Sequence, residues 1–188
     1  MPGVAIQDFV AKLRCCSEED FANVPHVHQM LCQHPIEARS IEQYLIWDSQ
    51  HYTRNLIDKT PLFEVMAICW DVGQDSSIHN HMDQNCWMTV PIGRLLVQNY
   101  RVVQQDLKAG TCDLRATDVM EMNPTNPCAV DPANPVHRVY NPAEFHERAV
   151  SVHVYSRPYD SCVVYSDALH KCGEIKLSYT SEYGLVHK

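Results

Sequence analysis

The sequence predicts a mainly β fold, a small sandwich or barrel, that follows an N-terminal helical segment. Residues 1–50 carry helical patterns, whereas residues 51–188 carry short runs of β-prone residues separated by turn-forming residues. Many short strands with turn signals between them are typical of sandwiches and barrels. No repeat, low-complexity segment or linker interrupts the chain, so we expect one domain over residues 1–188.

Three helices are expected in residues 1–50. The apolar face of the first consists of Ile6, Phe9, Val10 and Leu13. The second helix begins after Ser17, because this residue and the acidic residues that follow it are typical of a helix cap. The third begins at Pro35, since proline suits the first turn of a helix, and runs to about Gln50.

The remaining chain contains β-prone runs and one proline-rich segment. The runs lie at residues 52–58, 62–70, 86–91, 95–103, 119–122, 149–155, 162–165 and 175–179. Residues 123–135 contain four prolines, so they are expected to form a loop and no strand.

Composition excludes several classes of protein. The net charge of -8 disfavours binding to nucleic acid or to anionic membranes. The longest apolar runs, such as 65–70, are too short to span a bilayer, and the first residues lack the pattern of a signal peptide. The nine cysteines have no repeated spacing, which favours free thiols in a reducing compartment. We expect a cytoplasmic monomer.

Three histidines form the candidate metal centre. If residues 79–81 are extended, the side chains of His79 and His81 point to the same side of the strand. His137 is the best candidate for a third ligand, and three imidazoles suit iron, zinc or copper. Three protein ligands leave positions for a substrate, as catalysis requires. A His-x-His pair alone is more often an ordinary surface or core pair.

The residues around these histidines strengthen the metal hypothesis. The pattern Gly-x5-His-x-His-x4-Cys-x6-Gly over residues 73–93 resembles the first cupin motif, with Cys86 where most cupins carry a glutamate ligand. Residues 132–141, with His137, resemble the second motif. The resemblance implies a single cupin, a small β-barrel of the jelly-roll type over residues 51–188.

The cysteine at position 86 points to one branch of the cupins. From about Tyr52 to Gly184, the chain resembles the cysteine dioxygenase family. This implies an Fe(2+) enzyme that uses O2 to oxidise L-cysteine to cysteine sulfinic acid. The metal ligands would be His79, His81 and His137.

The same resemblance implies catalytic and substrate-binding residues. The catalytic group would be the relay Ser151, His153 and Tyr155, together with Cys86, which would form a thioether bond with Tyr155. The substrate-binding residues would be Arg54, Tyr52, Trp70, Ile68 and Cys162. Plainer interpretations exist for three of these: a surface position for the arginine, a core position for the tryptophan, and locally satisfied polar residues for the relay.

Arg157 departs from the family, which usually has proline at this position. Without that proline, a trans peptide bond is expected between residues 156 and 157. An arginine here resembles the related mercaptopropionate dioxygenases, and Arg157 could compete with Arg54 for a substrate carboxylate. The alternatives are therefore a dioxygenase for another thiol, such as 3-mercaptopropionate or cysteamine, and a metal-binding cupin without oxygen chemistry.

Overall fold

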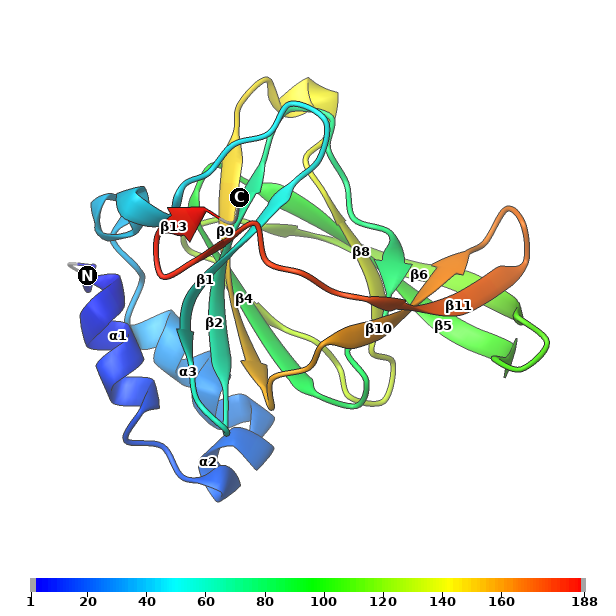
Figure 1. Ribbon diagram of the computed structural model, residues 1–188, viewed down its shortest axis with the longest axis horizontal. Helices are drawn as coiled ribbons and strands as arrows, with labels where there is room; N and C mark the ends of the chain where they lie inside the picture. The colour runs from blue at the N-terminus through cyan, green and yellow to red at the C-terminus, as the bar shows by residue number, and fades with distance from the viewer. Residues whose placement is uncertain (1–2, 187–188) are drawn as a thin grey trace.

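The computed structural model describes residues 3–186 and contains more strand than helix, with most of the helices before the first strand (Figure 1). The mainly β fold with an N-terminal helical segment is therefore confirmed. The helices are α1 (Ile6–Leu13), α2 (Glu18–Ala22), α3 (Val24–Gln33) and the 3-10 helices η1 (Ala38–Tyr44) and η2 (Ala143–Phe145).

The strands form a seven-stranded sheet and a second set that closes on itself. In spatial order, the first sheet consists of β13 (Leu185–Val186), β12 (Ser181–Glu182), β1 (Thr53–Lys59), β2 (Glu64–Trp70), β9 (Ala149–Ser156), β4 (Asn85–Ile92) and β7 (Cys128–Ala129). The second consists of β10 (Ser161–Ser166), β11 (Lys171–Lys176), β6 (Thr111–Met122), β5 (Leu95–Asp106), β8 (Val136–Tyr140) and β3 (Ile78–His79).

Each expected strand overlaps an observed one, but some bounds were wrong. β6 begins at residue 111 instead of 119, because it pairs along β5 in a long hairpin whose turn ends at Gly110, with φ of 70°. The strand expected at 175–179 ends at residue 176. The proline-rich segment contains the two-residue strand β7, which pairs with β4, so the expectation of no strand there was wrong.

Two helix predictions are confirmed and the third was wrong. The expected apolar face of α1 is buried, and Ser17 forms a complete capping box with Asp20 at the start of α2. The third α-helix ends at Gln33, before Pro35, because the residue that precedes a proline is disfavoured in helical conformation. Residues 38–44 form only the 3-10 helix η1.

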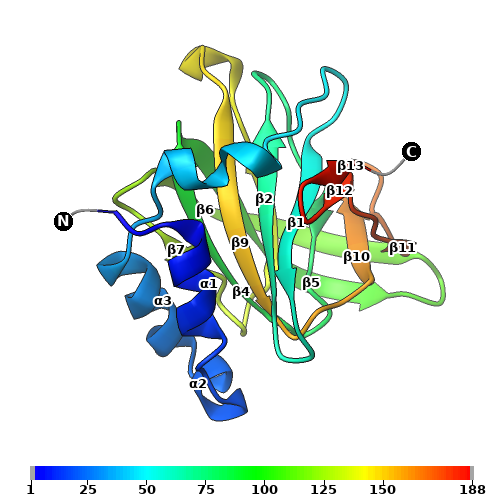
Figure 2. The ribbon, with the colours of Figure 1, turned by 60° about the vertical axis from the view of Figure 1, so that its left-hand side comes forward.

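Two hydrophobic cores lie on opposite sides of the seven-stranded sheet. Figure 2 shows α1 and α3 on one face of this sheet. The core on that side contains helix residues such as Phe9 and Leu31 together with strand residues such as Val152. The other core contains the alternate strand residues, such as Met66 and Met88. Among residues 3–186, no helix is long and apolar enough to span a membrane.

Candidate active site

The structure brings the three predicted histidines together. His79 on β3 lies directly opposite His137 on β8 in the register of the two strands. The ring centroids of His79, His81 and His137 lie 4.8 to 5.1 Å apart. One ligand atom of each histidine lies within 4.8 Å of the others, so the three side chains can share one metal ion.

A tight turn directs His81 into the interior. The two residues that follow His81 have positive φ angles, 49° at Met82 and 62° at Asp83. The backbone N–H of Gln84 donates a hydrogen bond to the carbonyl of His81 at 2.9 Å. The side chain of Asn80 accepts a hydrogen bond from the N–H of Val163 at 2.9 Å, which ties the turn to β10. His81 itself is 0% exposed.

The histidine side chains have the chemistry that a metal ion requires. Burial lowers the pKa of His79 to about 4, and it lowers the pKa values of His81 and His137 well below the ordinary value. The rings are therefore neutral at neutral pH, with lone pairs free for coordination. Both ring nitrogens of His81 and of His137 are buried without a hydrogen-bond partner among the described residues. Such atoms are costly unless something binds them, and a divalent metal ion fits.

Residues 3–186 contain one further group of metal-ligand type. It consists of Cys16, Asp20 and His26, all partly exposed, near the helices. The carboxylate of Asp20 already accepts the hydrogen bonds of the α2 capping box. The histidine group has two completely buried members and lies beside a pocket, which makes it the stronger candidate for a catalytic centre.

A chain of hydrogen bonds connects four buried side chains beside the histidines. Trp70 Nε1 donates to Ser151 Oγ at 2.9 Å. Ser151 Oγ lies 2.7 Å from His153 Nε2, and Tyr155 Oη lies 2.9 Å from His153 Nδ1. Ser151, His153 and Tyr155 occupy alternate positions of β9, so their side chains lie on one face of the strand.

The proton positions in this chain follow from its donors and acceptors. Burial lowers the pKa of His153 to about 3, so its ring is neutral and has one donor and one acceptor nitrogen. The only acceptor within reach of the Ser151 hydroxyl proton, among the described residues, is His153 Nε2. His153 Nδ1–H then donates to Tyr155. This assignment leaves the hydroxyl proton of Tyr155 available to the sulfur of Cys86 or to a ligand.

Cys86 and Tyr155 are direct neighbours across two strands. They pair in the register of β4 and β9, and both are buried. Burial raises the pKa of the Cys86 thiol well above its ordinary value, although a hydrogen bond with Tyr155 lowers it. The thiol is therefore protonated at neutral pH. It lies next to Tyr155, which the family resemblance implies as its thioether partner.

Arg54 on β1 provides a partly buried positive charge in the same pocket. Its guanidinium donates to Met66 Sδ at 3.6 Å, and it forms no salt bridge within residues 3–186. Burial lowers the Arg54 pKa, but nearby acidic groups, including Tyr155, raise it above its usual value overall. A partly buried cation without a counter-ion can bind an anionic ligand.

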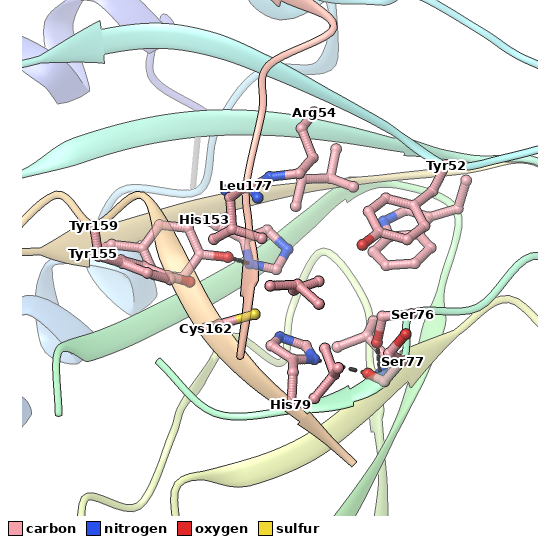
Figure 3. A pocket seen from close by; sticks show the side chains of 15 residues that line it. Tyr52, Arg54, Ser76, Ser77, His79, His153, Tyr155, Tyr159, Cys162 and Leu177 are labelled. Atoms are coloured by element: carbon pink, nitrogen blue, oxygen red, sulfur yellow. Dashed lines mark hydrogen bonds between the residues drawn. The ribbon is translucent and has the colours of Figure 1, made fainter. Parts of the chain in front are cut away.

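The pocket contains most of the predicted substrate-binding residues. Figure 3 shows Arg54 and His79 on opposite sides of it. The rings of Tyr52 and Trp70 stack at 4.7 Å between centroids and line the pocket wall together. The predicted residues that line it are Tyr52, Arg54, Ile68, Trp70, His79, His153, Tyr155 and Cys162. Ser151 and Cys86 are buried next to it without lining it.

Arg157 lies outside this pocket. Its guanidinium forms an exposed ion pair with Glu18 in α2, and its backbone N–H donates to Gln84. The structure therefore does not bring Arg157 into competition with Arg54. The peptide bond between Ser156 and Arg157 is cis, so the expected trans geometry was wrong.

Sequence reasoning missed several pocket residues. They are Ser76, Ser77, Val139, Tyr159, Val164, Ile175 and Leu177. The ring of Tyr159 lies 5.2 Å from that of Tyr155. The alternation of Ile175 and Leu177 in a β-prone run was a usable signal, because alternate residues of an extended segment share one face. The alternation alone could not show that this face lines the pocket.

Comparisons with known proteins show which proteins this chain resembles. A zebrafish (Danio rerio) protein named cysteine dioxygenase type 1 is 29% identical over 95% of this chain and 88% of its own length. The human (Homo sapiens) protein of that name is 27% identical over 96% of this chain and 88% of its own length. The structure of KdgF from Halomonas sp. aligns with 64% of this chain and 93% of its own, at 14% identity and a TM-score of 0.47. The sequence model of the family "Cysteine dioxygenase type I" matches residues 3–168, and the chain belongs to this family.

Proposed function

We propose that this protein oxidises L-cysteine with O2 to cysteine sulfinic acid at an Fe(2+) ion held by His79, His81 and His137. One observation carries the proposal. Three neutral histidines converge on one point, and one of them, His79, lines a pocket whose opposite side carries Arg54, a partly buried arginine without a salt bridge among the described residues. A small thiol that also carries a carboxylate can span these two sides. Family membership supports the same reaction.

The three histidines would hold the metal ion. Three protein ligands leave coordination positions free for a substrate, whereas a structural site would be closed. Bound there, ferrous iron would favour the thiolate form of the substrate and supply the redox chemistry with O2. In the balanced reaction, both oxygen atoms of O2 end on the sulfur of the thiol, which becomes a sulfinic acid.

The protein's own residues would bind and orient the substrate. Arg54 would donate two parallel N–H hydrogen bonds to the carboxylate, and Tyr52 would lie beside it. Trp70 and Ile68 would form the wall of the pocket, and Cys162 would lie near its mouth. Because His153 donates to the oxygen of Tyr155, the Tyr155 hydroxyl could donate its own proton to the bound substrate.

We also propose the thioether bond between Cys86 and Tyr155. A bond between the sulfur and a ring carbon removes two hydrogen atoms, and O2, the co-substrate, would accept the two electrons. The bond would fix the ring of Tyr155 before substrate binds, which lowers the entropy cost of ordering it. Mass spectrometry of a sample turned over with cysteine should detect a linked peptide pair around residues 86 and 155. Unlinked peptides in every such sample would refute the bond.

The decisive experiment identifies products from a panel of thiols. Anaerobically purified protein should contain iron and should consume O2 with L-cysteine, giving the sulfinic acid. Preference for 3-mercaptopropionate or cysteamine would move the assignment to another thiol dioxygenase. Protein that contains zinc and consumes no O2 with any thiol, even after iron is supplied, would be a metal-binding cupin of another function.

The proposal extends to the organisation of the chain. The N-terminal helices share a hydrophobic core with the first sheet, which supports one domain. The nine free cysteines suit a reducing compartment, and we propose a cytoplasmic monomer. Analytical ultracentrifugation at micromolar concentration tests the oligomeric state, because a dimer would sediment faster than a chain of 21.5 kDa.

A further inference from the structure

The segment from Ile175 to Thr180 contributes two residues to the lining of the pocket. Ile175 and Leu177 line it, and Figure 3 shows Leu177 close to Arg54. The segment is fixed at both ends. The N–H of Leu177 donates to the carbonyl of Asp160 at 2.8 Å, and the N–H of Thr180 donates to the carbonyl of Arg54 at 2.7 Å. Tyr179, two residues further along, lies beside Arg54 without lining the pocket.

Tyr179 is held in place next to Arg54. The centroid of its ring lies 6.0 Å from Cζ of Arg54. Its hydroxyl donates to Glu64 Oε2 at 2.5 Å and accepts from Lys59 Nζ at 3.0 Å. With one donor and one acceptor engaged, the ring has little freedom to rotate away from the guanidinium.

The carboxyl group of Glu64 lies behind this arrangement. It lies opposite Tyr155 in the register of β2 and β9, and therefore on the sheet face that carries the pocket. The side chain is 0% exposed. Burial raises its pKa, while Tyr179, Lys59 and Arg54 lower it. Glu64 thus interacts electrostatically with Arg54 without forming a salt bridge to it, which leaves the guanidinium donors free for a ligand.

We propose that Tyr179 is a positioning residue for Arg54, and that its anchoring by Glu64 and Lys59 makes the pocket selective for thiols that carry a carboxylate. The inference rests on the proposed function, because it assumes that Arg54 binds the substrate carboxylate. Tyr179 acts through Arg54 and does not touch the reacting atoms. Loss of its hydroxyl frees the ring, the guanidinium loses its fixed orientation, and only ligands that use the guanidinium are affected.

Equilibrium binding under argon tests this with two thiols. L-cysteine carries the carboxylate and cysteamine lacks it, and both are titrated into metal-loaded protein by calorimetry. In Tyr179→Phe, the Kd for L-cysteine should rise about fivefold to tenfold, while the Kd for cysteamine stays within about twofold. Under turnover, the same variant should raise KM for L-cysteine with little change in kcat. Tyr183→Phe is the matched control, because Tyr183 is 57% exposed, and both thiols should bind to it as to the wild type.

Two further variants change the residues that hold the Tyr179 hydroxyl. They separate the effect of the ring's orientation from the effect of the Glu64 side chain. Glu64→Gln keeps an oxygen acceptor for Tyr179 but removes the charge, so the Kd for L-cysteine should rise less than in Tyr179→Phe. Lys59→Met removes a partly exposed donor to the same hydroxyl, and we expect a rise of about twofold for L-cysteine alone. It serves as the test if Tyr179→Phe does not fold.

The outcomes are distinct for the two proposals. Equal shifts for both thiols, or no shift for either, would overturn the positioning role of Tyr179. Wild-type protein that oxidises no thiol would refute the proposed function, whereas the binding comparison would still decide the role of Tyr179. If the wild type turns over L-cysteine normally and Tyr179→Phe binds both thiols with wild-type Kd values, only the positioning role of Tyr179 is refuted.

Discussion

Two polar clusters lie in contact inside the barrel, and they differ in how their hydrogen bonds are satisfied. In the relay from Trp70 to Tyr155, both ring nitrogens of His153 have partners. In the neighbouring histidine group, both ring nitrogens of His81 and of His137 have none among the described residues. The rings of His81 and Tyr155 are only 5.6 Å apart, so burial alone does not explain the difference.

The difference separates a positioning cluster from a binding cluster. A buried polar atom without a partner costs about 1–3 kcal/mol, so a fold retains a group of them only where a ligand completes them. A fully bonded chain such as the relay holds its end group, Tyr155, in one orientation. We therefore expect changes in the histidine group to remove metal, and changes in the relay to leave metal bound.

The largest effect is expected from His81→Ala. The loss of one of three ligands should empty the site, so metal content should fall from about one equivalent to near zero and turnover by about two orders of magnitude or more. Elemental analysis and O2 uptake measure this. His170→Ala is the control, because His170 is exposed and paired with Asp113 at the surface. This variant should keep the wild-type metal content and turnover. Full metal content and turnover in His81→Ala would show that His81 is not a metal ligand.

Arg54→Gln tests the far side of the pocket. The metal should remain bound, while kcat/KM for L-cysteine should fall about a hundredfold, because a two-donor, charged contact to the carboxylate is lost. Product analysis under oxygen gives the rate, and exposed Arg39→Gln is the matched control. An unchanged kcat/KM in Arg54→Gln would show that another group binds the carboxylate.

Cys86→Ala should have a smaller effect on turnover. The variant cannot form the thioether, so the ring of Tyr155 keeps more freedom and activity should fall about tenfold without being abolished. Metal content should stay at the wild-type level. Cys128→Ala is a suitable control, since Cys128 is also buried in the same core but is not paired with Tyr155. Complete loss of activity with intact metal would give the sulfur a role beyond fixing the ring.

His153→Gln sharpens the comparison through pH. Burial lowers the folded-state pKa of His153 to about 3, so between about pH 3 and 6.5 the unfolded chain binds the additional proton. The stability from this group is complete above about pH 6.5 and is lost as the pH falls toward 3. In His153→Gln, the slope of unfolding free energy against pH should be shallower by about one proton in this window. Urea unfolding of metal-free protein at several pH values measures it.

The smallest effect is expected from Arg157→Ala. The side chain lies outside the pocket in an exposed ion pair with Glu18, and exposed pairs contribute little. KM for L-cysteine should stay within about twofold of the wild-type value. A larger rise, confined to thiols with a carboxylate, would mean that Arg157 reaches the substrate after all.

The sequence predicted the metal-binding and relay residues of the site better than the residues that form the wall of the pocket. Histidines at 79, 81 and 137 were identified from motif spacing, and alternation placed residues 151, 153 and 155 on one face. Tyr159 and Leu177 were missed because their contribution depends on how the segments after β9 and β11 cross the pocket. The same limit applies to the helices, since Pro35 was interpreted as a start although the preceding helix ends before it.

By itself, the sequence determined the mainly β class, the N-terminal helical segment and the identity of the candidate ligands. These depend on local periodicity and on motif spacing, which need no knowledge of distant contacts. Only the tertiary structure decided that Arg157 lies beside Glu18, that Arg54 is partly buried without a salt bridge to any described residue, and that the hydroxyl of Tyr179 is held by Glu64 and Lys59. The physical reason is that burial and charge pairing are set by segments more than a hundred residues apart, such as Arg54 and Thr180, whose contact no local pattern encodes.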